Sequence, residues 1–142
     1  MIGAIAGDII GSRFEFNNCK SKEFKLFSKD CSATDDSIMT LAIAKAIMEA
    51  AKNKMQNKNE YDVAFHDALG KLTVKHMQEL GRKYPDCGFG GMFFKWVFSA
   101  NPEPYNSYGN GAAMRISSVG FIANNILQAQ QLAKTVTEVT HT

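Results

Sequence analysis

The chain has 142 residues, of which 45% are hydrophobic and 21% charged, and its formal net charge is +2. A chain of this size buries roughly two thirds of its unfolded surface on folding, so the composition predicts one globular domain and excludes a disordered protein. The small net charge without a basic block excludes an electrostatic nucleic-acid surface. The apolar runs are shorter than the roughly 20 residues that cross a bilayer, so we expect neither nucleic acid nor membrane as a partner.

The long segments are rich in helix-forming residues and lack the alternating β-branched runs of strands, which predicts an all-α chain. In chain order, the expected helices cover residues 2–11, 34–52, 61–80, 92–98, 112–123 and 126–140. Segment 17–32 reads as a loop with a few anchoring aromatic residues, 52–60 as a polar turn, and Gly81 as the residue that ends the third helix.

The first helix has glycine at every fourth position, at Gly3, Gly7 and Gly11. These positions share one helix face, so we expect another backbone to approach closely there. Asp8 lies within this apolar helix and needs either hydrogen-bond donors or a nearby cation. It also interrupts the apolar N-terminus, which argues against a secretory signal.

The second helix begins with a hydroxyl and two carboxylates, Thr34, Asp35 and Asp36. Helix N-termini favour such residues for capping, with Ser32 or Thr34 as the cap. Hard oxygen ligands in this pattern also suit Mg²⁺, Mn²⁺ or Ca²⁺. Capping is the commoner role of such residues, and the pattern alone leaves both open.

Glu15 lies between Phe14 and Phe16 and is seven residues after Asp8. An apolar setting raises the pKa of a carboxyl group unless a metal or a base compensates, so Glu15 is a candidate acid, base or metal ligand.

Two glycine-rich turns, 88–91 and 109–111, each precede an expected helix. Backbone N–H groups in such turns can bind a phosphate, although such a turn taken alone is more often an ordinary loop. His66 and His76 lie in the third helix without a partner motif, so we expect no functional role for them.

The last 42 residues are poor in charge. Positions 1–100 hold 26 charged residues, whereas positions 101–142 hold four. We therefore expect this chain to be the front part of a larger unit, with exposed apolar surface within 116–139 that an oligomer or a second chain covers. Three cysteines without C-x-x-C spacing predict reduced thiols in a cytoplasmic protein.

The motifs occur together in one order along the chain. They are Gly3-x-x-x-Gly7-Asp8-x-x-Gly11-Ser12-x-x-Glu15, Ala33-Thr34-Asp35-Asp36-Ser37, Gly88-Phe89-Gly90, Gly109-Asn110-Gly111-Ala112-Ala113-Met114-Arg115 and Thr140-His141. In this order the chain resembles the N-terminal part of the ADP-ribosylglycohydrolase family, which includes the dinitrogenase reductase-activating glycohydrolases. The resemblance covers essentially all 142 residues.

The resemblance implies an all-α, orthogonally packed fold, of which residues 1–142 form the N-terminal half. It implies a hydrolase that cleaves the bond between ADP-ribose and a modified protein side chain or a related adduct, with water bound to Mg²⁺ or Mn²⁺. The implied metal ligands are Thr34, Asp35, Asp36 and Glu15, with Glu15 and Asp36 also catalytic. The implied substrate-binding residues are Gly88, Phe89, Gly90, Gly109, Asn110, Gly111, Met114 and His141.

The chain departs from the family in one respect, because the later Gly-Gly-Asp-x-Asp-Thr motif that supplies opposing metal ligands is absent from these 142 residues. Two interpretations therefore stay open. The first is a part of a hydrolase that is inactive or weakly active alone. The second is a module that binds ADP-ribose or a protein partner without turnover. The residues do not discriminate among arginine, serine and small-molecule linkages.

Overall fold

A computed structural model describes residues 1–54 and 61–142. These two stretches contain six α-helices, two 3₁₀ helices and no β-strand, which confirms the predicted all-α class. The elements are α1 (Ile2–Gly11), η1 (Ser12–Phe14), α2 (Asp35–Lys54), α3 (Val63–Lys83), α4 (Gly91–Phe98), α5 (Gly111–Arg115), η2 (Ile116–Phe121) and α6 (Ile126–Thr137). The polar turn expected over 52–60 lies, from residue 55 onward, outside the described residues.

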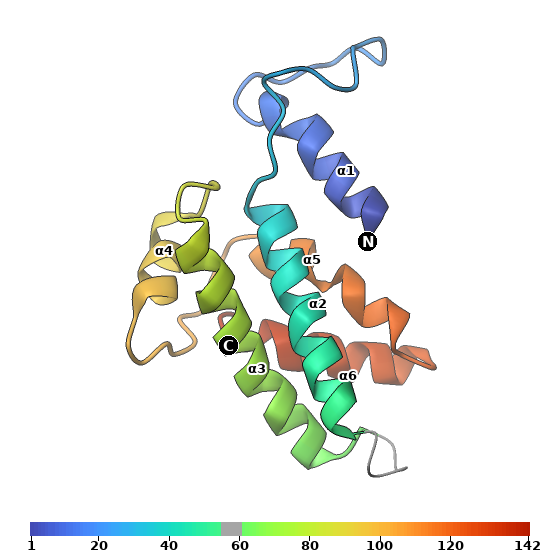
Figure 1. The fold of residues 1–142 in the computed structure, drawn as a ribbon, viewed down its shortest axis with the longest axis vertical. Helices are drawn as coiled ribbons and strands as arrows, with labels where there is room; N and C mark the ends of the chain where they lie inside the picture. The colour runs from blue at the N-terminus through green and yellow to red at the C-terminus, as the bar shows by residue number, and fades with distance from the viewer. Residues whose placement is uncertain (55–60) are drawn as a thin grey trace.

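Helices α2 and α3 form an antiparallel pair at the centre of the molecule, and α6 runs across this pair (Figure 1). Apolar residues recur at helical spacing on the inner face of α2, where the buried positions are Met39, Ala42, Ile43, Ala46, Ile47 and Ala50. They pack in one core with Leu69 and Met77 of α3 and with Leu132 and Val136 of α6. This core supports the end of α2 at which the candidate site begins.

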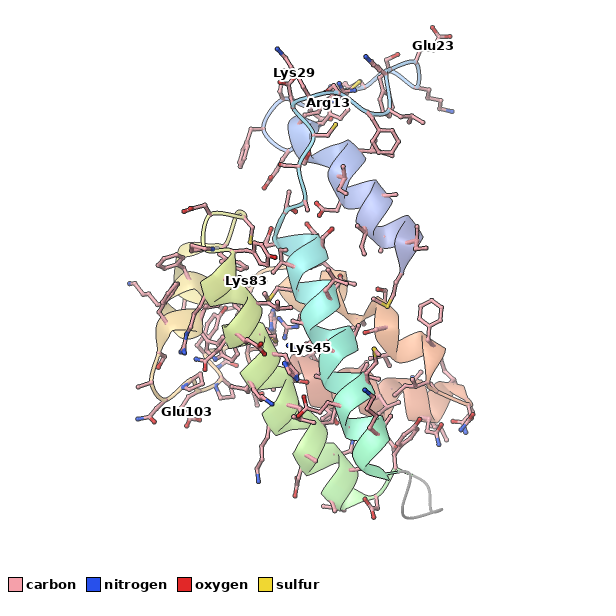
Figure 2. All side chains as sticks on the ribbon, in the orientation of Figure 1. Arg13, Glu23, Lys29, Lys45, Lys83 and Glu103 are labelled. Atoms are coloured by element: carbon pink, nitrogen blue, oxygen red, sulfur yellow. The ribbon has the colours of Figure 1, made fainter. Side chains whose placement is uncertain are left out.

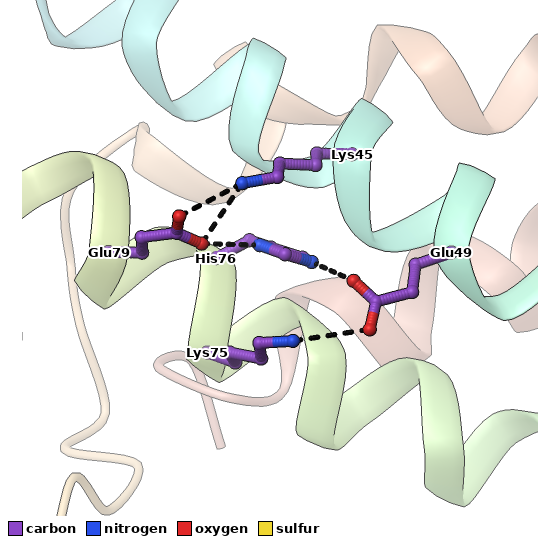
Figure 3. A network of polar contacts seen from close by, with 5 residues as sticks. All are labelled: Lys45, Glu49, Lys75, His76 and Glu79. Carbon is purple, nitrogen blue, oxygen red and sulfur yellow. Dashed lines mark hydrogen bonds and ion pairs between the residues drawn. The ribbon is translucent and has the colours of Figure 1, made fainter.

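A polar network joins α2 to α3 at His76, which is only 1% exposed (Figure 3). Its Nε2 lies 2.6 Å from Glu49 Oε2 and its Nδ1 lies 2.9 Å from Glu79 Oε2. Lys75 donates to Glu49 at 3.2 Å, and Lys45 donates to Glu79 at 3.0 Å. These bonds, chiefly from His76 at Glu49 and from Lys45 at Glu79, lower the pKa of both carboxyl groups. His76 is therefore a structural residue of the helix pair.

The segment after η1 forms the expected loop at the end of the molecule beyond α1, where Arg13 and Glu23 are labelled in Figure 2. Two contacts fasten it. The Arg13 guanidinium donates to the carbonyl of Lys25, and the rings of Phe14 and Phe24 meet edge to face with their centroids 5.3 Å apart. The expected loop is confirmed, whereas among the described residues only Phe24 of its two phenylalanines makes a ring contact, and Phe27 is 55% exposed.

The prediction that Gly81 ends the third helix is wrong, because α3 continues to Lys83. A Cβ atom at Gly81 would lie 2.8 Å from Cγ1 of Val97. The glycine is needed because α3 and α4 approach each other closely at this point, not because the helix stops there.

The prediction of a close backbone approach along the α1 glycines is wrong for the part of the chain that the structure describes. A Cβ atom at Gly3, Gly7 or Gly11 would meet no atom within 4 Å. Helix α1 has no buried residue, and hydrogen bonds to Asp8 fasten it to α2.

The charge-poor C-terminal segment is partly buried and partly exposed. It folds as α5, η2 and α6 rather than as the two helices expected. Leu132 and Val136 are buried, whereas Phe121, Ile126 and Leu127 are 68–72% exposed. Exposed apolar surface within 116–139 is thus confirmed, and a partner that covers it stays a prediction. Among the residues that the structure describes, we find no helix long and apolar enough to span a membrane.

Candidate functional site

A cavity of about 730 Å³ lies where the end of α1, the beginning of α2, the beginning of α4 and the segment 105–115 meet. Its lining contains every site residue proposed from the sequence except one. These lining residues are Glu15, Thr34, Asp35, Asp36, Gly88, Gly90, Gly109, Asn110, Gly111, Met114 and His141. The exception is Phe89, whose ring packs edge to face on Phe93 with the centroids 5.1 Å apart.

Asp8 fastens α1 to the beginning of α2. Its carboxylate accepts from the backbone N–H groups of Thr34 at 2.9 Å and of Ser37 at 3.2 Å. The hydroxyls of Thr34 and Ser37 donate to the same carboxylate. The expectation that Asp8 needs hydrogen-bond donors is therefore confirmed. This anchor places α1 and the residues after it beside the two carboxylates of α2.

Two carboxyl groups in the first turn of α2 form an acidic wall of the cavity. The Thr34 hydroxyl accepts from the Asp36 backbone N–H at 3.3 Å, as a helix cap does. Burial, followed by repulsion from Asp36 and more weakly from Glu15 and Asp8, raises the pKa of Asp35 to about 6. Burial and the charge of Asp8 also raise the pKa of Asp36. Two partly buried anions side by side are electrostatically strained, and a cation would relieve the strain.

Glu15 follows η1 at the edge of the cavity and is close enough to Asp35 to contribute to its raised pKa. The expectation that two phenylalanines enclose it is wrong, because Glu15 is exposed and Phe16 is 95% exposed. Its charge therefore faces the cavity and solvent.

The first glycine-rich turn is fitted to the acidic wall. The Asp35 backbone N–H donates to the carbonyl of Cys87 at 2.9 Å. Gly88 has a φ of 113°, and a Cβ atom there would lie 3.3 Å from Asp35 Oδ1. Both the backbone conformation and the space favour glycine. Burial and the neighbouring Asp35 raise the pKa of the Cys87 thiol to about 11.

The second glycine-rich turn, 109–111, lines another part of the cavity together with Arg115 and His141. Arg115 is only 1% exposed, and burial lowers its pKa to about 10, so it stays cationic at neutral pH. His141 Nε2 lies 3.0 Å from the Gly109 carbonyl oxygen. Tyr108 is fully exposed beside the turn.

Comparison with known proteins identifies the family of the chain. The profile of one family, described as ADP-ribosylglycohydrolase, matches residues 1–142. The chain belongs to the ADP-ribosylglycohydrolase family. It is 26% identical over 166 aligned residues to ADP-ribosylhydrolase ARH3 of Xenopus tropicalis. This alignment covers 99% of the chain and 43% of the relative, so the chain spans less than half of that protein's length. No solved structure matches the chain significantly.

The oxygen atoms of the acidic wall are of the kind that a hard divalent cation prefers, but they could surround such a cation from one side only. Thr34, Asp35 and Asp36 offer a hydroxyl and two carboxylates, and burial together with neighbouring carboxylates raises the pKa of both aspartates. Within residues 1–54 and 61–142, no three His, Cys, Asp or Glu side chains lie close enough to hold a metal ion together.

Sequence reasoning gave no role to Arg115, although it ends the motif beginning at Gly109. One signal was available, because Arg115 is one of four charged residues in positions 101–142. A charge in a segment so apolar is expected to be either buried and hydrogen-bonded or exposed for binding.

Proposed function

We propose that the cavity binds ADP-ribose and that the protein hydrolyses the glycosidic bond between ADP-ribose and a modified protein side chain or a related adduct. Beyond membership of the family, the observation that supports this most is the division of charge in the cavity. Asp8, Glu15, Asp35 and Asp36 line one part, and a buried cation, Arg115, lines another beside glycine-rich backbone. ADP-ribose has the matching division, with an anionic diphosphate next to a neutral ribose rich in hydroxyls.

In this proposal Thr34, Asp35 and Asp36 would hold Mg²⁺ or Mn²⁺, and Glu15 would have to move toward them to act as a further ligand, since the three carboxylates do not lie close enough to hold one ion together in this structure. The carboxyl groups of Asp35 and Asp36 support it, because burial and the neighbouring carboxylates raise their pKa values, and a bound cation would favour their charged forms. When bound, such a cation acts as a Lewis acid that orders ribose hydroxyls and lowers the pKa of a water molecule.

The chain's own residues would then bind the substrate, orient the attacking water and take up its proton. Glu15 or Asp36 would orient the attacking water and accept its proton. The negative carboxylates would also stabilise the positive charge that develops on the ribose. Residues 109–114 would contact the diphosphate and ribose through their backbone, and Gly88 and Gly90 would leave room for the ligand. Asp8 would hold α1 in place against the beginning of α2.

A second candidate is an ADP-ribose-binding or protein-interaction module without turnover. The one-sided acidic wall favours it, since no third His, Cys, Asp or Glu side chain joins Asp35 and Asp36 in a metal site within the described residues. In either case we propose a cytoplasmic protein, supported by three free cysteines, and a second chain or copy over the exposed apolar residues of η2 and α6.

The two candidates separate in one assay. The protein is incubated with Mg²⁺ and with arginine-, serine- and small-molecule-linked ADP-ribose, and free ADP-ribose is measured by chromatography. A hydrolase releases it, and the double variant Asp35→Asn/Asp36→Asn does not. Binding of ADP-ribose without release from any adduct supports the module. Release that the double variant leaves unchanged contradicts the proposed roles of these aspartates.

A further inference from the structure

Thr140 joins separate parts of the chain beside the cavity, and it is fully buried. Its carbonyl oxygen accepts from the backbone N–H groups of Tyr105 at 3.4 Å and of Ser107 at 3.1 Å. Asn106, between them, has a φ of 51°. A left-handed residue in this position turns the N–H groups before and after it toward one acceptor. Thr140 thus holds the loop that leads into the turn 109–111.

The side chain of Thr140 is held by Arg115. Arg115 Nη2 donates to Thr140 Oγ1 at 2.9 Å and to the Val136 carbonyl at 3.1 Å. A guanidinium has donors and no acceptor, so the Thr140 hydroxyl is the acceptor in this bond. The hydroxyl hydrogen is therefore left to be donated elsewhere.

The nearest acceptor for that hydrogen is His141. Thr140 Oγ1 lies 2.7 Å from His141 Nδ1, whereas the Thr137 carbonyl lies 3.5 Å away. On the other side of the ring, His141 Nε2 lies 3.0 Å from the Gly109 carbonyl oxygen, which can only accept. Nε2 therefore carries a hydrogen and Nδ1 accepts one, which is the Nε2–H tautomer.

We propose that Arg115 and Thr140 are positioning residues, which set the tautomer of His141 so that its Nε2–H holds the Gly109 carbonyl and fixes the turn 109–111. In this arrangement both ring nitrogens of His141 are hydrogen-bonded within the protein. The consequence for ligand binding rests on the proposed function, because it assumes that ADP-ribose contacts this turn.

The test uses ¹⁵N NMR of the labelled histidine rings together with calorimetric titration of ADP-ribose. Wild-type His141 is expected to show a protonated Nε2 and an unprotonated Nδ1 at neutral pH. Thr140→Val keeps the shape of the side chain and removes the hydroxyl, so we expect a mixture of tautomers and about fivefold weaker ADP-ribose binding. Thr140→Ser keeps the hydroxyl and is the matched control, with both readouts close to wild type.

Arg115→Lys is a second variant in case Thr140→Val does not fold. Lysine keeps the charge but lacks the guanidinium group that donates to both the Val136 carbonyl and the Thr140 hydroxyl. The tautomer of His141 should therefore shift as in Thr140→Val. An Nδ1–H tautomer in the wild type, or an unchanged tautomer in both variants, overturns the proposal. If the tautomers respond as expected while the wild type binds no ADP-ribose, the positioning role is supported and the proposed function fails.

Discussion

Replacing Asp35 by asparagine should stabilise the metal-free protein at neutral pH, although Asp35 is a central residue of the candidate site. The pKa of Asp35 rises from 3.8 to about 6 on folding because the carboxyl is buried beside Asp36. A folded-state pKa above the unfolded value means that the folded protein binds more protons between pH 3.8 and 6, so stability falls as the pH rises through this window.

The size of the effect follows from the same shift. The rise corresponds to about 3 kcal/mol if the site were fully shielded from solvent. The side chain is only partly buried, so screening reduces this to about 1 kcal/mol. For a domain of this size, that is a rise in Tm of about 3 °C. Asparagine has no charge to bury, so the gain of Asp35→Asn should appear at pH 7 and be absent below pH 3.8.

Thermal unfolding by circular dichroism measures this, in EDTA at pH 7 and at pH 3.5, and then in Mg²⁺ at pH 7. Asp67→Asn, an exposed change on α3 away from the cavity, is the matched control and should shift Tm at neither pH. With Mg²⁺ present, the wild type should gain stability and Asp35→Asn should not. A lower Tm for Asp35→Asn in EDTA at pH 7 would refute the electrostatic reasoning.

Three further changes test the framework around the site by urea unfolding. Gly88→Ala should cost about 2 kcal/mol, because φ is 113° and Asp35 Oδ1 is too near, whereas Gly90→Ala, with nothing near its Cβ, should be nearly neutral. Equal effects of the two alanines would contradict this. Asp8→Asn should cost about 2 kcal/mol by weakening its charge-assisted bonds to α2, and a neutral effect would show that Asp8 is no anchor. His76→Ala should cost about 3 kcal/mol, since it removes a buried ring bonded to two carboxylates, and a cost below 1 kcal/mol would argue against that network.

Features that depend on nearby residues were predictable from the sequence. The helical class follows from residue propensities, and the Thr34 cap with its two carboxylates follows from neighbours within one turn. The order of the motifs also predicted which residues line one cavity, with Phe89 as the exception.

Features that depend on distant partners were not predictable. Gly81 looked like a helix end because its contact, Val97, lies in another helix. His76 had no partner motif in the sequence because Glu49, to which it is hydrogen-bonded, belongs to α2. The role of Arg115 depends on Thr140, 25 positions later in the chain. In each case the residue type is set by a partner that only the fold brings near.

The most direct test of the central claim is calorimetric titration of ADP-ribose into the protein, once in Mg²⁺ and once in EDTA. If the cavity joins a divalent cation to ADP-ribose, the two ligands bind with positive coupling, so affinity should be higher in Mg²⁺. Asp35→Asn/Asp36→Asn should abolish the difference between the two buffers. No binding of ADP-ribose in Mg²⁺, or binding to wild type that is equally tight in EDTA, would contradict the account.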